Sequence, residues 1–411
     1  MHKLFKIAGR NLLRYKRRTL LTLGLIVTGV LFVSVFVGVS SSFKTMMIGQ
    51  ITDSFLGHMQ IHRKGYLAAI ETLPLTMNMK PRAVKKVEAV LKETPEIEAY
   101  SLRIKFGGLF SNFVETTNIR LNGVDPEEET KTVPLLLSRI KEREKVLRRG
   151  EILVPELLAR GMKVKVGDMV VVIATNKDGS VNGKQLKVGG ILESATGPGG
   201  RDGYVHIEDA MDILRMEDME ISEIAVRVKD FSKLHEVFGA LEARFSELTQ
   251  QGKPIFEVHT WERLSPFYNV ARMIDMMTFF IKLMLIAVVL ISIMNVMIMA
   301  VYERVREIGT MAAIGTLPAK ILSLFLVEGF LLGALGAVMG SALSVVIIYA
   351  INLAKFTYDF GRQTGLILKT SVGFQDLLVV SGIVIVVAIV ASLQPALKAS
   401  RMDPIQALGY V

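Results

Sequence analysis

A carboxylate within an apolar stretch is the most unusual candidate for chemistry in this sequence. Glu328 is the single charge in the 34 residues from 321 to 354. An ionisable residue inside a membrane span is costly and commonly functional. Two roles stay open for Glu328. It could be structural, paired with an arginine near the membrane surface, or it could take part in the passage of a proton or a substrate.

A second candidate is a run of mixed charges after the apolar stretch that ends at residue 302. Four charged residues and a glycine predict a short helix here: Glu303, Arg304, Arg306, Glu307 and Gly309. A short charged helix beside a membrane suits docking to a polar protein surface, and the alternative is a solvated loop. Both arginines are expected at the surface, where a substitution usually changes stability by no more than about 0.5 kcal/mol.

Patterns of catalytic and metal-binding residues are missing from the sequence. It has no cysteine, no phosphate-binding loop pattern, and neither the zinc-protease nor the nucleophile-elbow motif. His58 and His62 are four residues apart with no third ligand nearby, so we expect no metal site. The glycine-rich residues 197–203 miss the dinucleotide fingerprint and are predicted to be a loop. We therefore expect no catalytic, cofactor-binding or metal-binding residue, and no enzyme.

Four apolar segments must position these residues. About 20 apolar residues cross a bilayer as a helix, and we predict spans at residues 19–43, 273–302, 321–354 and 377–397. In the third span, Gly329, Gly333, Gly336 and Gly340 share one face. Small residues at this spacing let another helix approach closely, and that helix could belong to the same chain or to a second subunit.

Basic residues mark one side of the membrane. Residues 1–18 hold seven Lys and Arg and no acidic residue, whereas residues 45–272 hold 32 residues of each sign. The positive-inside rule places both termini, with residues 1–18, 303–320 and 398–411, in the cytoplasm. Residues 1–18 are predicted to form an amphipathic helix on the inner membrane surface, or to act only as a topology signal. The net charge of +10 thus lies beside the spans, so membrane lipid is an expected partner and nucleic acid is not.

The predicted extracytoplasmic part comprises residues 44–272 and a shorter loop at 355–376. Strand-like and helix-like patterns alternate near both ends of the large segment, for example in the helix that begins at Pro81. They predict one split α/β subdomain, with a β-rich insert at about 125–220. The fold class is thus a membrane protein with four transmembrane helices and a large extracytoplasmic α+β domain between helices 1 and 2.

Motifs along the chain carry a resemblance to a known family. The two most specific segments are residues 303–315, ERVREIGTMAAIG, and residues 395–408, PALKASRMDPIQAL. Together with residues 11–22 and short matches in the outer domain, they resemble permeases of the MacB/FtsX type of ABC transporter. That family includes macrolide-exporter and lipoprotein-releasing (LolC/LolE-like) permeases, and the lipoprotein-releasing permeases are the most similar in appearance.

The resemblance implies partners and a location. It implies an ABC ATPase subunit that binds ATP and Mg, a second permease chain that is identical or different, and residues 303–315 as the ATPase-coupling segment. It also implies the inner membrane and a periplasmic carrier or adaptor protein. The expected function is ATP-driven release of lipoproteins from the outer face of the membrane. Alternatives are macrolide or peptide export, and FtsX-like signalling to a cell-wall hydrolase.

A substrate site is expected between the first two spans near the outer leaflet. Apolar and weakly polar side chains predominate there, and they suit acyl chains better than ions. The predicted residues are Val33, Phe36, Val37 and Ser40 on the first span, and Phe279, Phe280, Leu283 and Ile286 on the second. Ordinary lipid or helix contact is the alternative for each single residue.

Overall fold

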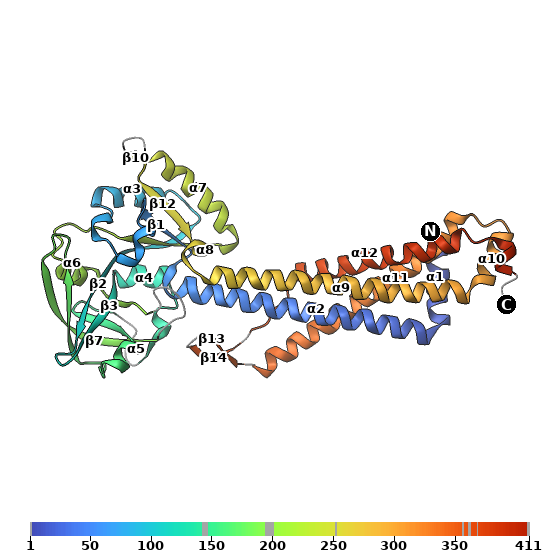
Figure 1. The fold of residues 1–411 in the computed structure, drawn as a ribbon, viewed down its shortest axis with the longest axis horizontal. Coiled ribbons are helices and arrows are strands. Elements are labelled where there is room, and N and C mark those ends of the chain that lie inside the picture. The colour runs from blue at the N-terminus through green and yellow to red at the C-terminus, as the bar shows by residue number, and fades with distance from the viewer. Residues whose placement is uncertain are drawn as a thin grey trace. The chain divides into compact units, whose positions relative to one another are not determined.

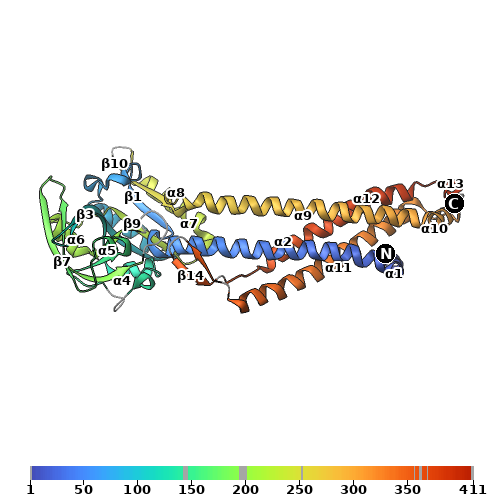
Figure 2. The same ribbon diagram turned by 60° about the horizontal axis from the view of Figure 1, so that its bottom comes forward.

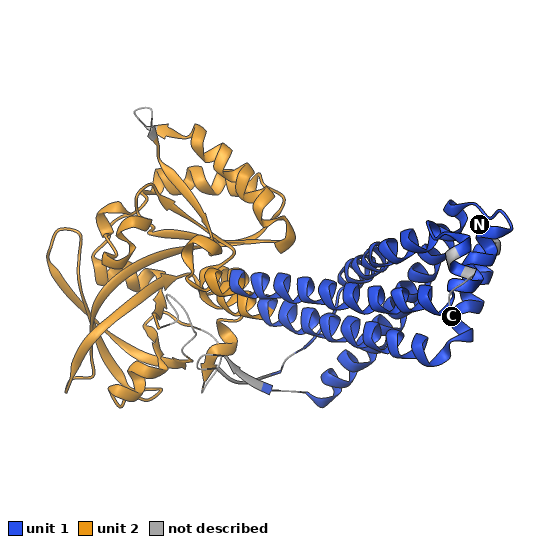
Figure 3. Ribbon diagram, turned by 45° about the vertical axis from the view of Figure 1, so that its right-hand side comes forward, with its two compact units in different colours: residues 1–45, 272–357, 367–411 blue, residues 46–271, 358–366 orange. Residues whose placement is uncertain are grey.

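The structure is a computed structural model, and it divides into two compact units (Figure 3). Unit 1 holds residues 1–45, 272–357 and 367–411, and unit 2 holds residues 46–271 and 358–366. The residues that the structure describes are 2–141, 147–193, 201–250, 253–355, 357–360, 363–367 and 369–408. The predicted glycine-rich loop therefore lies mostly outside the described residues.

Unit 1 is helical, and four of its helices are long and apolar enough to cross a membrane. These are α2 (Lys16–Ile51), α9 (Phe267–Glu303), α11 (Pro318–Ala354) and α12 (Phe374–Ser400), of which α2 and α9 each have one end in unit 2. Each is longer than the predicted span at one or both ends, because a helix continues through polar residues where the apolar pattern stops.

Three shorter helices complete unit 1: α1 (His2–Arg14), α10 (Val305–Ala313) and α13 (Pro404–Leu408). They lie at the same end of the helical bundle (Figures 1 and 2). That residues 1–18, 303–320 and 398–411 share the cytoplasmic side of the membrane stays a prediction. Between α11 and α12, β13 (Thr357–Phe360) and β14 (Gln363–Ile367) form a two-stranded sheet.

The glycine face of α11 packs against helices of the same chain. A Cβ added at Gly333 would lie 2.5 Å from Cβ of Ala388 on α12, and one at Gly336 would lie 2.4 Å from Cγ2 of Ile26 on α2. Gly329 meets α12 and Gly340 meets α2 in the same way. Of the two alternatives, contact within the chain thus accounts for the face.

Unit 2 is built on a ten-stranded mixed sheet, which confirms the predicted α+β class. Nine strands follow the order β12-β1-β9-β2-β3-β8-β5-β7-β4, and β6 pairs with β2 and β7. Their bounds are β1 (Met59–Arg63), β2 (Ile97–Ser111), β3 (Thr116–Val124), β4 (Ile140–Lys141), β5 (Glu151–Pro155), β6 (Met169–Thr175), β7 (Val181–Leu192), β8 (Gly203–His206), β9 (Glu223–Val228) and β12 (Phe256–Thr260). A separate short pair is β10 (Thr249–Gln250) and β11 (Lys253–Pro254).

Six α-helices accompany the sheet, and their bounds are α3 (Pro81–Lys92), α4 (Pro126–Thr132), α5 (Glu156–Gly161), α6 (Ile207–Leu214), α7 (Leu234–Glu247) and α8 (Trp261–Leu264). The π-helical turn η1 (Thr52–Leu56) follows α2. Helix α3 begins at Pro81 as predicted, because proline fits the first turn of a helix. Helix α6 was not predicted. It begins after His206, whose Nδ1 accepts a hydrogen bond from the Glu208 amide, and its first turn is acidic.

The two halves of the predicted split subdomain meet in the sheet. Strand β1 pairs with both β9 and β12, and β2 pairs with β9, so residues 60–120 and 221–260 share one sheet as predicted. The insert at 125–220 is rich in strands, and these strands extend the same sheet through β8 and β6. Val172 and Val154 of the insert belong to the same apolar cluster as Ile104 and Val226 outside it.

A substitution in the glycine face of α11 tests this packing. We expect Gly336→Ala to destabilise the chain by about 1–3 kcal/mol, because the new methyl group would collide with the stiff Ile26 side chain. Gly382→Ala on α12 is the matched control, because a Cβ there meets nothing within 4 Å. The measurement is the temperature at which purified protein in detergent loses half of its monodisperse fraction. Equal temperatures for both variants would contradict the packing.

Candidate functional site

Glu328 is the centre of a buried polar cluster in unit 1. It is fully buried in α11, and its Oε1 lies 2.8 Å from Nη1 of Arg304 in an ion pair. The same oxygen accepts a hydrogen bond of 2.7 Å from Nδ2 of Asn11 on α1. Of the two roles predicted for Glu328, the structure thus shows the structural one, pairing with an arginine.

Arg304 reaches this cluster because the chain turns between α9 and α10. It is the residue between the two helices, with φ −115° and ψ 18°, and only 4% of its surface is exposed. Its Nη2 donates a hydrogen bond of 3.4 Å to the backbone oxygen of Asn11. Its guanidinium carbon also lies 4.9 Å from the centre of the Tyr15 ring, a cation–π contact. One arginine therefore joins α1, α11 and the beginning of α10.

Two exposed ion pairs surround the buried one. Arg18 contacts Glu303 at 2.7 Å, and Arg14 contacts Glu307 at 3.0 Å. Exposed pairs of this kind each contribute about 0–1 kcal/mol. They nevertheless align the N-terminal residues with α10, so both predicted coupling carboxylates face the chain's own basic residues.

The predicted surface position of Arg304 is wrong. Arg304 and Gly309 are buried, while Arg306 and Glu307 are exposed. The prediction failed because Arg304 lies beyond the apolar span in sequence, whereas the turn after α9 brings it back to Glu328. Breaking a buried ion pair costs about 3–5 kcal/mol, so reversal of this charge would damage the fold.

The turn that follows α10 exposes apolar side chains. Ile314 and Leu317 are 77% and 61% exposed, and Gly315 between them has a φ of 88°. We call residues 314–317 the α10–α11 turn. Sequence reasoning did not single out Ile314 and Leu317, although two large apolar residues in a short loop between spans are a detectable signal. Ile314 and Leu317 give the α10–α11 turn an exposed apolar surface.

The predicted substrate residues differ in burial and fall into three groups. Val33 and Val37 are buried in the apolar core of unit 1, whereas Phe279, Phe280 and Leu283 are exposed. The remaining three, Phe36, Ser40 and Ile286, are half-buried. Phe279 and Phe280 form an edge-to-face pair with ring centres 5.7 Å apart. The structure thus gathers an outward aromatic surface on α9, and the predicted site itself stays a prediction.

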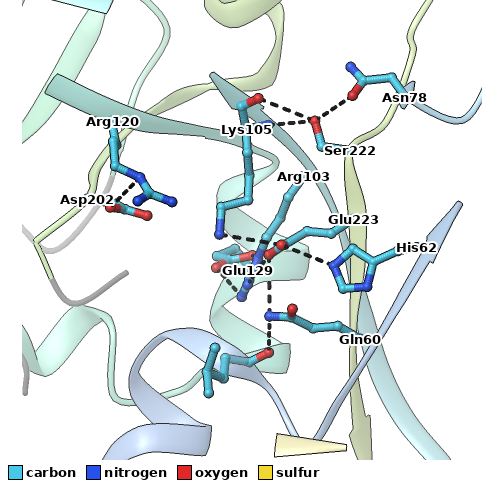
Figure 4. A network of polar contacts seen from close by, with 11 residues as sticks. Gln60, His62, Asn78, Arg103, Lys105, Arg120, Glu129, Asp202, Ser222 and Glu223 are labelled. Atoms are coloured by element: carbon cyan, nitrogen blue, oxygen red, sulfur yellow. Dashed lines mark hydrogen bonds and ion pairs between the residues drawn. The ribbon is translucent and has the colours of Figure 1, made fainter. Parts of the chain in front are cut away.

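Unit 2 contains a buried polar face on part of its sheet (Figure 4). Arg103 on β2 makes ion pairs of 2.8 Å with Glu129 of α4 and 2.9 Å with Glu223 of β9. Lys105 and His62 lie 3.4 and 3.6 Å from the same Glu223 carboxylate. Burial opposes ionisation of Glu223, but Lys105, His62 and Arg103 outweigh it and hold the pKa of Glu223 well below its usual range.

Successive side chains of a strand point to opposite faces of the sheet, so one strand can present polar residues on one face and apolar residues on the other. Arg103 and Lys105 share the polar face with Glu223, whereas Ile104 and Phe106 point into the apolar core of unit 2. Within the described residues, both ring nitrogens of His62 and of His259 have no hydrogen-bond partner. No group of three or more His, Asp and Glu in the described part of the chain is arranged to hold a metal ion.

The polar face predicts a pH dependence of stability. Burial lowers the pKa of His259 below its ordinary value of 6.5, against the opposing effect of Glu257. The unfolded chain therefore takes up a proton that the folded chain refuses, so stability is complete above pH 6.5 and falls as the pH drops below it. The depressed pKa of Glu223 adds a second loss below about pH 4.5.

The urea midpoint of the full chain in detergent should thus fall between pH 7.5 and pH 5.5. The single tryptophan, Trp261, is buried in unit 2 and reports this transition by fluorescence. His259→Gln should reduce the change with pH, whereas His235→Gln, at an exposed position, should not. An unchanged pH profile in His259→Gln would refute the assignment.

Comparison with known proteins identifies both parts of the chain. The MacB-like periplasmic core domain matches residues 19–244, more than half of the chain. The FtsX-like permease C-terminal domain matches residues 279–404.

Named proteins are also similar to this chain. The lipoprotein-releasing system transmembrane protein LolC of Xylella fastidiosa is 26% identical over 71% of this chain and 72% of its own. The probable export ATP-binding/permease protein MacB of Pseudomonas entomophila is 25% identical over 98% of this chain, which spans 58% of that protein. Among solved structures, the periplasmic region of MacB from Actinobacillus actinomycetemcomitans is similar over 51% of this chain and 91% of its own, with 13% identity and a TM-score of 0.36. The chain therefore belongs to the MacB- and FtsX-like family of ABC transporter permeases.

Proposed function

We propose that this permease works in the bacterial inner membrane with a separate ABC ATPase, which binds ATP and Mg and docks on the α10–α11 turn. The observation that carries this proposal is the exposed apolar pair Ile314 and Leu317, next to α10. A large exposed apolar side chain in a loop suits insertion into a partner's surface. The MacB relative carries ATP-binding in its name, which supports an ABC ATPase as the partner.

The proposed docking surface differs from the one expected on the sequence. Glu303, Arg304 and Glu307 contact the chain's own residues, so we assign them to holding the segment in place. The ATPase contact is instead assigned to the α10–α11 turn, with Arg306 on the exposed side of α10.

We further propose that the substrate is a lipoprotein, or another amphiphile, taken from the outer face of the membrane. The LolC relative is matched over most of its length, which supports lipoprotein release. The exposed aromatic pair of Phe279 and Phe280 suits contact with acyl chains or with a second permease chain. Macrolide or peptide export is the second candidate, because a MacB relative is similarly identical. FtsX-like signalling rests on the C-terminal family match alone.

Substitution in the α10–α11 turn tests the docking proposal. We expect the double variant Ile314→Asp, Leu317→Asp to lose the co-purifying ATPase at least tenfold, because two charges would enter an apolar contact. Val114→Asp is the control, since Val114 is 87% exposed in unit 2, so the same change costs the fold little. The measurement is the molar ratio of ATPase to permease after affinity purification. An unchanged ratio in the double variant would place the docking site elsewhere.

A photo-crosslinker tests the substrate proposal. At Phe279, which is 62% exposed on α9, we expect ATP-dependent capture of an acylated protein. Val379 on α12 is the matched position, since it is 48% exposed and also lies in an apolar helix. Capture of acylated protein at Val379 to the same extent would show only non-specific lipid contact. Capture of a small molecule or peptide at Phe279 would favour export.

A further inference from the structure

The buried cluster around Glu328 is the contact that ties the segment after α9 to the rest of unit 1. Arg304 stands at the beginning of α10, Glu328 in α11 and Asn11 in α1, and distances of 2.7–2.8 Å join them through one carboxylate oxygen. Helix α10 connects Arg304 to the α10–α11 turn, and α11, which carries Glu328, begins at the other end of that turn. A displacement of the turn therefore acts on both members of the ion pair through the helices that carry them.

Stability alone is a poor explanation for this cluster. A buried ion pair loses much of its attraction to desolvation, and apolar residues of similar size often stabilise a core as well or better. The second carboxylate oxygen of Glu328 has no hydrogen-bond partner among the described residues, which adds to the cost. What an ion pair offers in place of stability is a directional connection between two specific groups.

Beyond Glu328, α11 packs closely against α12 and α2 through its glycines. Gly329 directly follows Glu328, and a Cβ there would lie 1.9 Å from Oγ of Ser392 on α12. Further along the same face, a Cβ at Gly336 would lie 2.4 Å from Cγ2 of Ile26, and one at Gly340 would lie 2.7 Å from Cβ of Val30, both on α2. A helix packed this closely cannot shift at Glu328 without moving its neighbours, because close-packed interiors transmit displacement.

The N-terminal helix is part of the same unit. Phe5 of α1 packs edge to face on Phe330 of α11, with ring centres 6.1 Å apart. Asn11 lies two turns further along α1 and contacts both members of the ion pair. Helix α1 is therefore joined to α11 at two points, one apolar and one polar.

We propose that Arg304 is a positioning residue that couples the ATPase to the membrane helices. Through Glu328 and Asn11 it converts a displacement of α10 into a joint movement of α1, α11 and, through the glycine face, α2 and α12. This inference rests on the proposed function, because it needs an ATPase bound at the α10–α11 turn.

The test uses a variant that removes the charges together, so that no unpaired charge stays buried. In Arg304→Gln, Glu328→Gln, the two amides can still meet, but the ionic connection is lost. The chain has no cysteine, so Ser41→Cys, at an exposed position of α2, accepts a single environment-sensitive fluorophore. The labelled permease is assembled with its co-purifying ATPase in proteoliposomes, and both ATP hydrolysis and the ATP-induced fluorescence change are measured.

We expect the double variant to bind the ATPase and to hydrolyse ATP within about twofold of the unmodified rate, while the fluorescence change falls at least fivefold. Arg14→Gln, Glu307→Gln removes the exposed pair by the same chemical change and should leave the fluorescence change intact. Arg304→Lys on the unmodified background keeps the charge and should retain much of the change. A merely structural role would lower assembly, hydrolysis and movement together.

A milder variant keeps the test decisive if the double variant does not assemble. Asn11→Ala leaves the ion pair in place and removes only the contact of α1, and we expect a two- to threefold smaller fluorescence change with unaltered hydrolysis. The inference would be overturned if Asn11→Ala, and any variant at Arg304 and Glu328 that assembles, showed the same fluorescence change as the permease without substitutions. That result would leave the docking proposal intact. Failure of the unmodified permease to bind an ATPase would overturn both.

Discussion

A carboxylate within an apolar helix needs a partner from its own protein, and this constraint organises one end of unit 1. The desolvation cost of Glu328 can be offset only by a nearby positive charge with good geometry. Arg304 supplies that charge because the chain breaks its helix between α9 and α10. Three further features lie around this contact: the turn between α9 and α10, helix α1, and the ion pairs of Arg14 and Arg18.

Much of the architecture was predictable because its signals are local. Long apolar segments predict helices, and the alternating patterns near both ends of the outer segment, with the helix that begins at Pro81, predict the α/β class of unit 2. The ends of the helices were not predictable from hydropathy, because backbone hydrogen bonding continues through polar residues such as Lys16 and Asn269. Helix α6 was missed because its signal is a capping histidine and two acidic residues, a weak pattern beside a strong strand.

The candidate site was predictable only in part, because it depends on contacts between residues far apart in sequence. The motif located the segment at 303–315, but it could not show which charges point inward. Arg304 and Arg306 are chemically alike and two residues apart, yet only the fold distinguishes the buried one from the exposed one. The polar face of unit 2 could not be predicted for the same reason. Glu223 on β9 contacts Arg103 on β2 and His62 on β1, and these three strands are far apart in the sequence.

The glycine face of α11 also determines how this helix can slide. Its four small residues are divided lengthwise, two against α12 and two against α2, at spacings of three or four residues. A slide of three or four residues moves the helix by about 4.5–6 Å, but because the spacings are unequal, no single slide brings all four glycines to one another's places. Any slide would therefore put a larger side chain where a glycine now fits, so steric contact opposes movement of α11 along its own axis relative to α2 and α12.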